Sequence, residues 1–350
     1  MFLQVIKGLL IFILSIIFIS NCSREKKPAE KDKARVLYEP QEDITSSIRE
    51  PTVAGTFYPD DPGVLDKMVE HFLSSAREDK SIRKINEPIA IILVPHAGYV
   101  VSGRTAAYAY ALLEGRDYDI VVLIGSPHRA DVHGASVYCG CGFRIPFGVI
   151  PVDTDLARAV VSSSELITDN ELPHRYEHSL EVQLPFLEKV LDDFAIVPIL
   201  VMGDAKTLDH IALAIFKAVS KACGTGKSIL YIVSTDLSHY PKKEDAVKCD
   251  SEILQAFLSL EGDTLLKTND DIMKRGVYNL ACAMCGLDAA YVGIKIANAA
   301  GANKAVILHR SVSSDAGIEG VSSEQVVGYA SVAVTATANT RNVRDNGIPF

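Results

Sequence analysis

Three histidines each follow one of the most apolar stretches of the chain, and this placement is the first sign of chemistry. His96 comes directly after IAIILVP (89–95), His128 follows DIVVLIG, and His239 closes ILYIVSTDLS. Continuous β-branched and aliphatic runs of this kind are typical of strands that are buried on both faces. Because ligands bind beyond the carboxyl ends of the strands in open α/β sheets, we expect the three imidazoles to share one site.

The residues around His96 predict a sharp turn. Pro95 lacks the N–H that would continue a strand ladder, and Gly98 is expected to let the chain bend back into a helix over 103–114. A single histidine in such a loop is more often a plain turn residue than a ligand. The same placement at His128 and His239 favours a shared site over that simpler interpretation.

A cysteine pair adds soft donor atoms to these histidines. Cys282 and Cys285 form a lone CxxC, and Cys285 opens a small-residue helix pattern over 285–300. Imidazole is the commonest metal ligand, and a set with thiolate suits iron, copper or zinc. The CxxC alone could also be a disulfide, half a metal site or two buried small residues. HExxH, GxSxG and Walker A motifs are absent from the sequence, so it does not support serine-nucleophile or phosphate-loop chemistry.

The block HRYEHSLEVQLPFL combines charged residues with an apolar helical pattern. Ser179 is expected to cap a helix over 179–192. Two interpretations remain open for the charged residues. In the first, Glu177, His178 and Glu181 serve this cap and the helix dipole. In the second, His178 and Glu181 lie on the rim of the pocket as supporting groups or substrate contacts.

Strands and helices alternate after residue 88. Expected strands are 89–95, 119–125, 195–201, 228–234, 304–309 and 326–334, and expected helices are 103–114, 153–164, 179–192, 207–222, 243–258 and 285–300. Before them, Asp60, Asp61 and Pro62 indicate a helix start. The alternation predicts an α/β fold, a three-layer sandwich around a central, largely parallel or mixed sheet. We expect one domain over 48–338 and a loose tail over 339–350.

The N-terminal residues predict targeting rather than core structure. Lys7 precedes an unbroken apolar stretch, which ends in Ile19-Ser20-Asn21-Cys22 and a charged segment. This ending resembles a bacterial lipobox, so 1–22 is expected to be a lipoprotein signal peptide and Cys22 the lipidated residue. A cleaved secretory signal and an uncleaved anchor are the alternatives. Residues 23–47 then form a flexible linker, and the protein is lipid-anchored in the bacterial cell envelope, on the periplasmic or surface side of a membrane.

The composition narrows the range of partners. Apolar residues make up 48% and charged residues 23% of the chain, so a folded core is expected. The net charge of −9 and the lack of a basic patch exclude a general nucleic-acid binder.

Eight blocks in a fixed order resemble the Memo family, the protein B component of the AmmeMemoRadiSam system. They cover residues 50–335 and read VAGTFYP, VPHAGYVVSG, IGSPHR, IPVDTDLA, EHSLEVQLPFL, PILVMGD, VSTDLSHY and RSVSSD. The family is similar in fold to the class III extradiol (LigB-like) dioxygenases. Those enzymes hold a non-haem iron ion with two histidines and a glutamate, and a further histidine serves as acid and base.

The resemblance implies a role for each matching residue. His96 and His128 would bind the metal, and Cys285 would take the place of the dioxygenase glutamate, with Cys282 as the alternative ligand. His239 would move protons, with Asp236 beside it. The implied function is a metal-dependent oxidoreductase with Fe or Cu. The alternative is a non-catalytic protein that binds a metal, a small molecule or a peptide in the same pocket, because a thiolate in place of a carboxylate puts dioxygenase activity in doubt.

Overall fold

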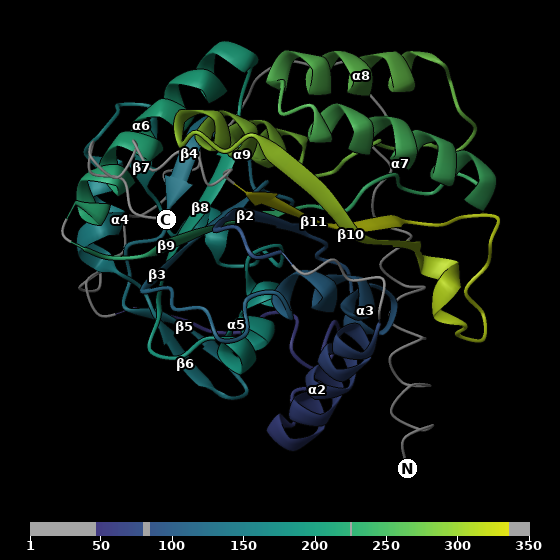
Figure 1. The fold of residues 1–350 in the computed structure, drawn as a ribbon, viewed down its shortest axis with the longest axis horizontal. Coiled ribbons are helices and arrows are strands. Elements are labelled where there is room, and N and C mark those ends of the chain that lie inside the picture. Colours follow the sequence, from purple (N-terminus) through teal and green to yellow (C-terminus); the bar gives the residue numbers. More distant parts are fainter. Residues whose placement is uncertain (1–46, 80–84, 225, 336–350) are drawn as a thin grey trace, which may run out of the picture.

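The computed structural model describes residues 47–79, 85–224 and 226–335, and in this part of the chain helices cover both faces of a large sheet (Figure 1). The strands are β1 (Ile48–Arg49), β2 (Ile89–Val94), β3 (Ile120–Gly125), β4 (Gly134–Val137), β5 (Gly142–Ile145), β6 (Gly148–Pro151), β7 (Ile167–Asp169), β8 (Ala195–Met202), β9 (Ile229–Ser234), β10 (Lys304–Val312) and β11 (Gly328–Thr335). The α-helices are α2 (Pro62–Glu78), α3 (Tyr99–Tyr110), α4 (Thr154–Val161), α5 (Leu184–Val190), α6 (Ala205–Cys223), α7 (Lys243–Leu258), α8 (Gly262–Lys274) and α9 (Leu287–Ala299).

The large sheet is mixed. Its strand order is β10-β11-β2-β9-β3-β8-β4-β7. The central strands β2, β9, β3 and β8 run parallel, whereas β11 is antiparallel to both of its neighbours and β4 is antiparallel to β8. A second, smaller sheet has the order β1-β5-β6. The prediction of a largely parallel or mixed sheet is therefore confirmed.

Helices form the two outer layers. Helices α2, α3 and α5 pack against one another on one face of the sheet, while α4, α6 and α9 cover the other face (Figure 1). Helices α7 and α8 continue this second layer beside α9. The architecture is thus the predicted α/β three-layer sandwich.

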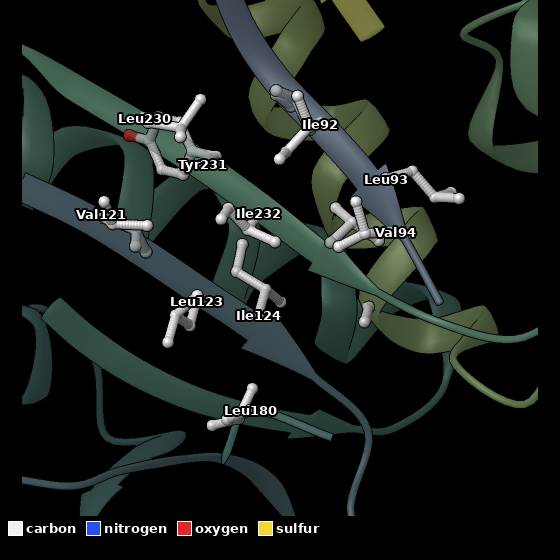
Figure 2. Packing of buried hydrophobic residues seen from close by; sticks show 14 of the residues in the cluster. Ile92, Leu93, Val94, Val121, Leu123, Ile124, Leu180, Leu230, Tyr231 and Ile232 are labelled. Atoms are coloured by element: carbon white, nitrogen blue, oxygen red, sulfur yellow. The ribbon is translucent and has the colours of Figure 1, made fainter. Parts of the chain in front are cut away.

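The central strands are buried on both faces, as their continuous apolar runs predict. Figure 2 shows side chains of β2, β9 and β3 packed in one cluster, among them Ile92, Ile232 and Leu123, which have no solvent exposure. Burying an aliphatic side chain of this size contributes about 1.5–3 kcal/mol relative to leaving it exposed. Leu180 from the block before α5 reaches the same cluster. The strand ends that carry the histidines therefore project from a tightly packed core.

Two of the predicted helix starts have a side-chain cap, and one does not. Asp61 accepts from the Val64 N–H and Asp153 accepts from the Leu156 N–H, so both predicted helix starts are confirmed. The prediction that Ser179 caps a helix is wrong. A 3₁₀ turn over Glu181–Gln183 precedes α5, and the Ser179 hydroxyl donates to the Ser126 carbonyl instead.

The turn after His96 also differs from its prediction. Helix α3 begins at Tyr99, earlier than expected, because the Gly98 carbonyl accepts the N–H groups of Val101 and Ser102. Gly98 has φ −57°, which any residue adopts, so the bend does not depend on a glycine there.

Several elements were not predicted from the sequence. Helix α8, the small sheet, and the short strands β4 and β7 were not expected from the apolar pattern. These strands have only three or four residues, too few to show a period, and β1 has two.

The expected signal peptide 1–22, Cys22 and the tail 339–350 lie outside the described residues, as does all of the expected linker except residue 47. Among the residues that are described, every helix is too short or too polar to cross a bilayer.

Candidate metal centre

Three of the predicted site residues, all histidines, lie at the same edge of the sheet, at the ends of parallel strands. Strand β9 lies between β2 and β3, with Ser234 opposite Val94 and Val233 opposite Ile124. The chain therefore leaves all three strands at nearly the same height. His96 and His128 stand on the loops after β2 and β3, and His239 stands on the loop after β9.

Three of the predicted ligands converge on one point. The donor atoms of His96, His128 and Cys285 all lie within 4.8 Å of one another. Cys285 Sγ is 3.1 Å from His96 Nε2, and the His96 and His128 ring centroids are 4.9 Å apart with an interplanar angle of 80°. His96 is buried, whereas 27% of the His128 side chain is exposed. The group is thus reachable from solvent on the His128 side.

A close approach of two chain segments positions Cys285. The Gly286 N–H donates to Thr235 Oγ1 at 2.9 Å, and the Asp236 N–H points at Cys285 Sγ at 3.2 Å. A Cβ atom on Gly286 would lie 2.7 Å from the Ser234 carbonyl oxygen and 2.6 Å from the Thr235 Cβ. A glycine after the cysteine therefore lets the start of α9 lie against the end of β9.

Cys282 lies beside His239 rather than in this group. Its Sγ is 3.4 Å from His239 Nδ1, and the backbones of the two residues form an isolated bridge. Burial, together with the charges of Asp236 and Asp250, raises the pKa of the Cys282 thiol to about 12. Cys282 and Cys285 are both free thiols. Of the two alternatives for the cysteine ligand, the structure brings Cys285 to the histidines.

Asp236 and His239 form a second cluster with Cys285. The Asp236 carboxylate accepts the backbone N–H of His96 at 2.8 Å, and its burial raises its pKa to about 7. His239 Nδ1 lies 2.9 Å from the Leu237 carbonyl. Because a carbonyl can only accept, Nδ1 carries the hydrogen of the neutral ring and Nε2 is left with a lone pair. Burial lowers the pKa of His239, which favours this neutral form.

His178 is the third histidine at the opening of the site. Its ring centroid is 4.7 Å from that of His128, 5.2 Å from that of His96 and 5.2 Å from that of Phe57. Desolvation lowers the pKa of His178 to about 4, so the ring is neutral at pH 7. The ring lies beside both histidines with 14% of its side chain exposed.

Glu177 orients His128, a role that the sequence did not reveal. Its carboxylate accepts the His128 backbone N–H at 2.5 Å, His128 Nδ1 at 2.9 Å and the Ser179 N–H at 2.9 Å. Burial alone would raise the pKa of Glu177, but the hydrogen bond from the His128 side chain lowers it, and the net result is a pKa below the usual value of a glutamate. The acid is therefore ionised, and a carboxylate on Nδ1 leaves His128 Nε2 available to a metal ion.

Glu181 is not on the rim, in contrast to its prediction. The residue has no solvent exposure and forms an ion pair with the buried Arg49. It also accepts the backbone N–H groups of Thr52 and Val53 and the hydroxyl of Tyr58. Glu181 thus holds the first described residues of the chain against the segment that carries Glu177. Its charge could be noticed in the sequence, but its partner lies 132 positions away.

The donor set fits a transition-metal ion. Burial lowers the pKa of His96, and a neutral imidazole is the form that binds metals. Burial, with the charges of Asp236 and Cys282, raises the pKa of Cys285, so without a metal ion it is a thiol. Metal binding would displace this proton. Two imidazole nitrogens and one sulfur suit iron, copper or zinc and do not suit magnesium or calcium.

Comparisons with known proteins agree with this arrangement. A family model described as "Memo-like protein" matches residues 49–333, which include every residue of the site. A MEMO1 family protein of Archaeoglobus fulgidus is 35% identical over 288 residues, covering 81% of this chain and 98% of its own. One from Methanosarcina barkeri is 36% identical over 291 residues, covering 82% and 100%, and one from Aquifex aeolicus is 35% identical over 272 residues, covering 77% and 93%. By these matches over nearly the whole folded region, the chain belongs to the Memo family.

Proposed function

We propose that His96, His128 and Cys285 bind one iron or copper ion. The observation that carries this proposal is the convergence of their donor atoms within 4.8 Å, at the edge of the sheet where ligands bind. Glu177 on the far nitrogen of His128 supports it, because metal-bound histidines usually donate their other N–H to a carboxylate or carbonyl. When bound, such an ion supplies one-electron chemistry and polarises a substrate group.

We propose further that the protein is a metal-dependent oxidoreductase related to the extradiol dioxygenases. His239 would take and return a proton at Nε2, since its Nδ1 hydrogen is held by the Leu237 carbonyl. Asp236 would hold the backbone at His96 and border the same space. His178, neutral and partly exposed beside His128, would contact the substrate, a small molecule or a peptide.

A specific observation favours a second function, which is metal or ligand binding without turnover. The third donor is a sulfur rather than a carboxylate oxygen. Sulfur ligands select softer ions such as Cu(I), which suits metal handling as well as catalysis. In this case the pocket would bind a metal ion, a small molecule or a peptide and release it unchanged.

Metal content tests the site. Protein purified without chelators is expected to hold about one Fe or Cu per chain by elemental analysis. His96→Ala and His128→Ala should lose the metal while keeping the fold by circular dichroism, because each removes one of three ligands. His210→Ala, an exposed histidine on α6, is the matched control and should keep it. Full occupancy in both ligand variants, or no metal in the wild type, contradicts the proposal.

Turnover separates the two functions. Metal-loaded protein with ascorbate as reductant is expected to consume many equivalents of oxygen, and His239→Ala should bind metal normally but lose this consumption. Uptake that stops after one equivalent in the wild type favours the binding function.

We propose separately where the protein is located in the cell. The N-terminal segment supports lipidation at Cys22 and attachment to a membrane in the bacterial cell envelope, on the periplasmic or surface side. The negative charge of the chain supports partners other than nucleic acid.

A further inference from the structure

Ser234, the last residue of β9, lies behind His96 on the side away from Cys285. Its hydroxyl oxygen is 3.0 Å from His96 Nδ1, 3.0 Å from Gln183 Nε2 and 2.6 Å from the Ser179 carbonyl oxygen. Ser234 and Gln183 are fully buried or nearly so. No solvent molecule is needed to explain the contacts of this hydroxyl, since it already has three partners in the protein.

The hydrogens on these contacts can be assigned by counting donors. A serine hydroxyl has one hydrogen and can accept two more. The Ser179 carbonyl only accepts, so at 2.6 Å it takes the Ser234 hydrogen. Gln183 Nε2 only donates. The remaining contact, with His96 Nδ1, is favourable only if the imidazole nitrogen donates, because otherwise two lone pairs would face each other.

The orientation of the Gln183 amide is itself determined. The Tyr110 hydroxyl donates to Gln183 Oε1 at 2.7 Å, while Nε2 lies 3.0 Å from the Pro95 carbonyl. A flipped amide would turn its oxygen toward that carbonyl and lose the bond. The chain of contacts from Tyr110 through Gln183 to Ser234 is thus consistent with one arrangement of hydrogens.

We propose that Ser234, held by Gln183, is a positioning residue that keeps the hydrogen of His96 on Nδ1 and so directs the Nε2 lone pair at Cys285 and the metal position. This inference deepens the proposed metal site and rests on it for its function. The two histidine ligands are then fixed by different partners, since His128 is held by the Glu177 carboxylate and His96 by a neutral hydroxyl. The neutral Ser234 hydroxyl is a weaker hydrogen-bond acceptor than the Glu177 carboxylate. His96 is therefore the less basic of the two histidine ligands.

The tautomer is measured directly in metal-free protein. Long-range ¹H–¹⁵N correlation spectra of ¹⁵N-histidine-labelled protein distinguish the two ring forms, and His96→Ala identifies the His96 signals. The wild type is expected to carry the hydrogen on Nδ1. In Ser234→Ala the hydrogen should shift partly or wholly to Nε2, and the affinity for Fe(II) or Cu(I) should fall about 10–100-fold. Ser234→Thr keeps a hydroxyl and should restore both properties.

The matched control is Ser331→Ala on β11. Ser331 is also buried in the same sheet, but its hydroxyl has no partner among the described residues. A hydrogen on His96 Nε2 in the wild type overturns the inference. The inference is also overturned if Ser234→Ala and Ser331→Ala have the same His96 tautomer and the same metal affinity. If Ser234→Ala does not fold, the wild-type and Ser234→Thr spectra still decide. Wild-type protein that binds neither metal refutes the proposed function alone, because the tautomer is read without metal.

Discussion

Cys285 Sγ lies 3.1 Å from His96 Nε2, although the two residues are 189 positions apart in the chain. The end of β9 buries this contact on one side, and the contact faces His128 on the other. It therefore lies at the centre of the site. If the pair holds a metal ion, Cys285 must be a thiolate. A disulfide between Cys285 and Cys282 would remove this thiolate.

We therefore expect both cysteines to be reduced in the metal-bound protein, with Cys285 protected from alkylation until the metal is removed. Mass spectrometry after iodoacetamide treatment, with and without chelator, measures this. A stoichiometric Cys282–Cys285 disulfide in metal-loaded protein would reject Cys285 as the ligand.

Glu177→Gln should weaken metal binding about 10–100-fold without unfolding the protein. The substitution removes the negative charge that faces His128 Nδ1, and it turns an NH₂ group toward one of the three N–H groups that donate to Glu177. Competition with a chelator of known affinity gives the change. Glu188→Gln on α5, which is exposed, serves as the control. Equal affinity in the two variants would show that Glu177 does not tune His128.

Arg49→Met should lower the free energy of unfolding by about 3–5 kcal/mol, because it leaves the Glu181 carboxylate buried without its counter-charge. Urea denaturation followed by circular dichroism measures the loss. Arg144→Met in the same small sheet removes only an exposed pair with Glu50 and should cost about 0–1 kcal/mol. Similar losses of unfolding free energy in both variants would mean that the buried Arg49–Glu181 pair stabilises the protein no more than the exposed Arg144–Glu50 pair does.

Asp250→Asn should change how stability depends on pH. Burial raises the pKa of Asp250 to about 7 in the folded protein, where its carboxylate accepts the Ser238 N–H. The folded state then binds more protons than the unfolded state between about pH 4 and pH 7, so stability falls as pH rises through this window. The variant should lose the part of this slope that comes from Asp250, while Asp236, whose pKa burial also raises to about 7, keeps its own part, and the variant should be the more stable protein at pH 8. Parallel unfolding curves against pH for the two proteins would contradict the assignment.

Cys22→Ser should abolish lipid attachment. The expected result is an unprocessed precursor and no incorporation of labelled palmitate, since Cys22 is the proposed site of lipidation. Cys249→Ser, a buried cysteine in the folded domain, should be processed normally. Normal labelling of the Cys22 variant would remove the lipoprotein proposal.

The layers of the fold and the placement of His96, His128 and His239 at one edge could be predicted from the sequence, because both depend on long apolar runs, whereas Cys285 was implied as a donor only by the family resemblance. IAIILVP and its counterparts identify buried strands, and the residue after each run then lies at a known edge. The partners of those donors could not be predicted. Glu177 reaches His128 across 49 positions and Arg49 reaches Glu181 across 132, and nothing in a local pattern encodes such contacts. The sequence left Glu181 either at a helix cap or on the rim of the pocket, whereas the buried counter-charge of Arg49 holds it in the interior.

The long separation between His96 and Cys285 also sets the order of events during biosynthesis. The ribosome must complete nearly the whole domain before the third donor exists, so the proposed three-ligand site cannot form while the chain is still growing. A chain that crosses a membrane before it folds would reach its final compartment without metal. Under the proposed lipid anchoring, the ion would come from the supply outside the cytoplasm, and the choice between iron and copper would depend on which of them that compartment offers.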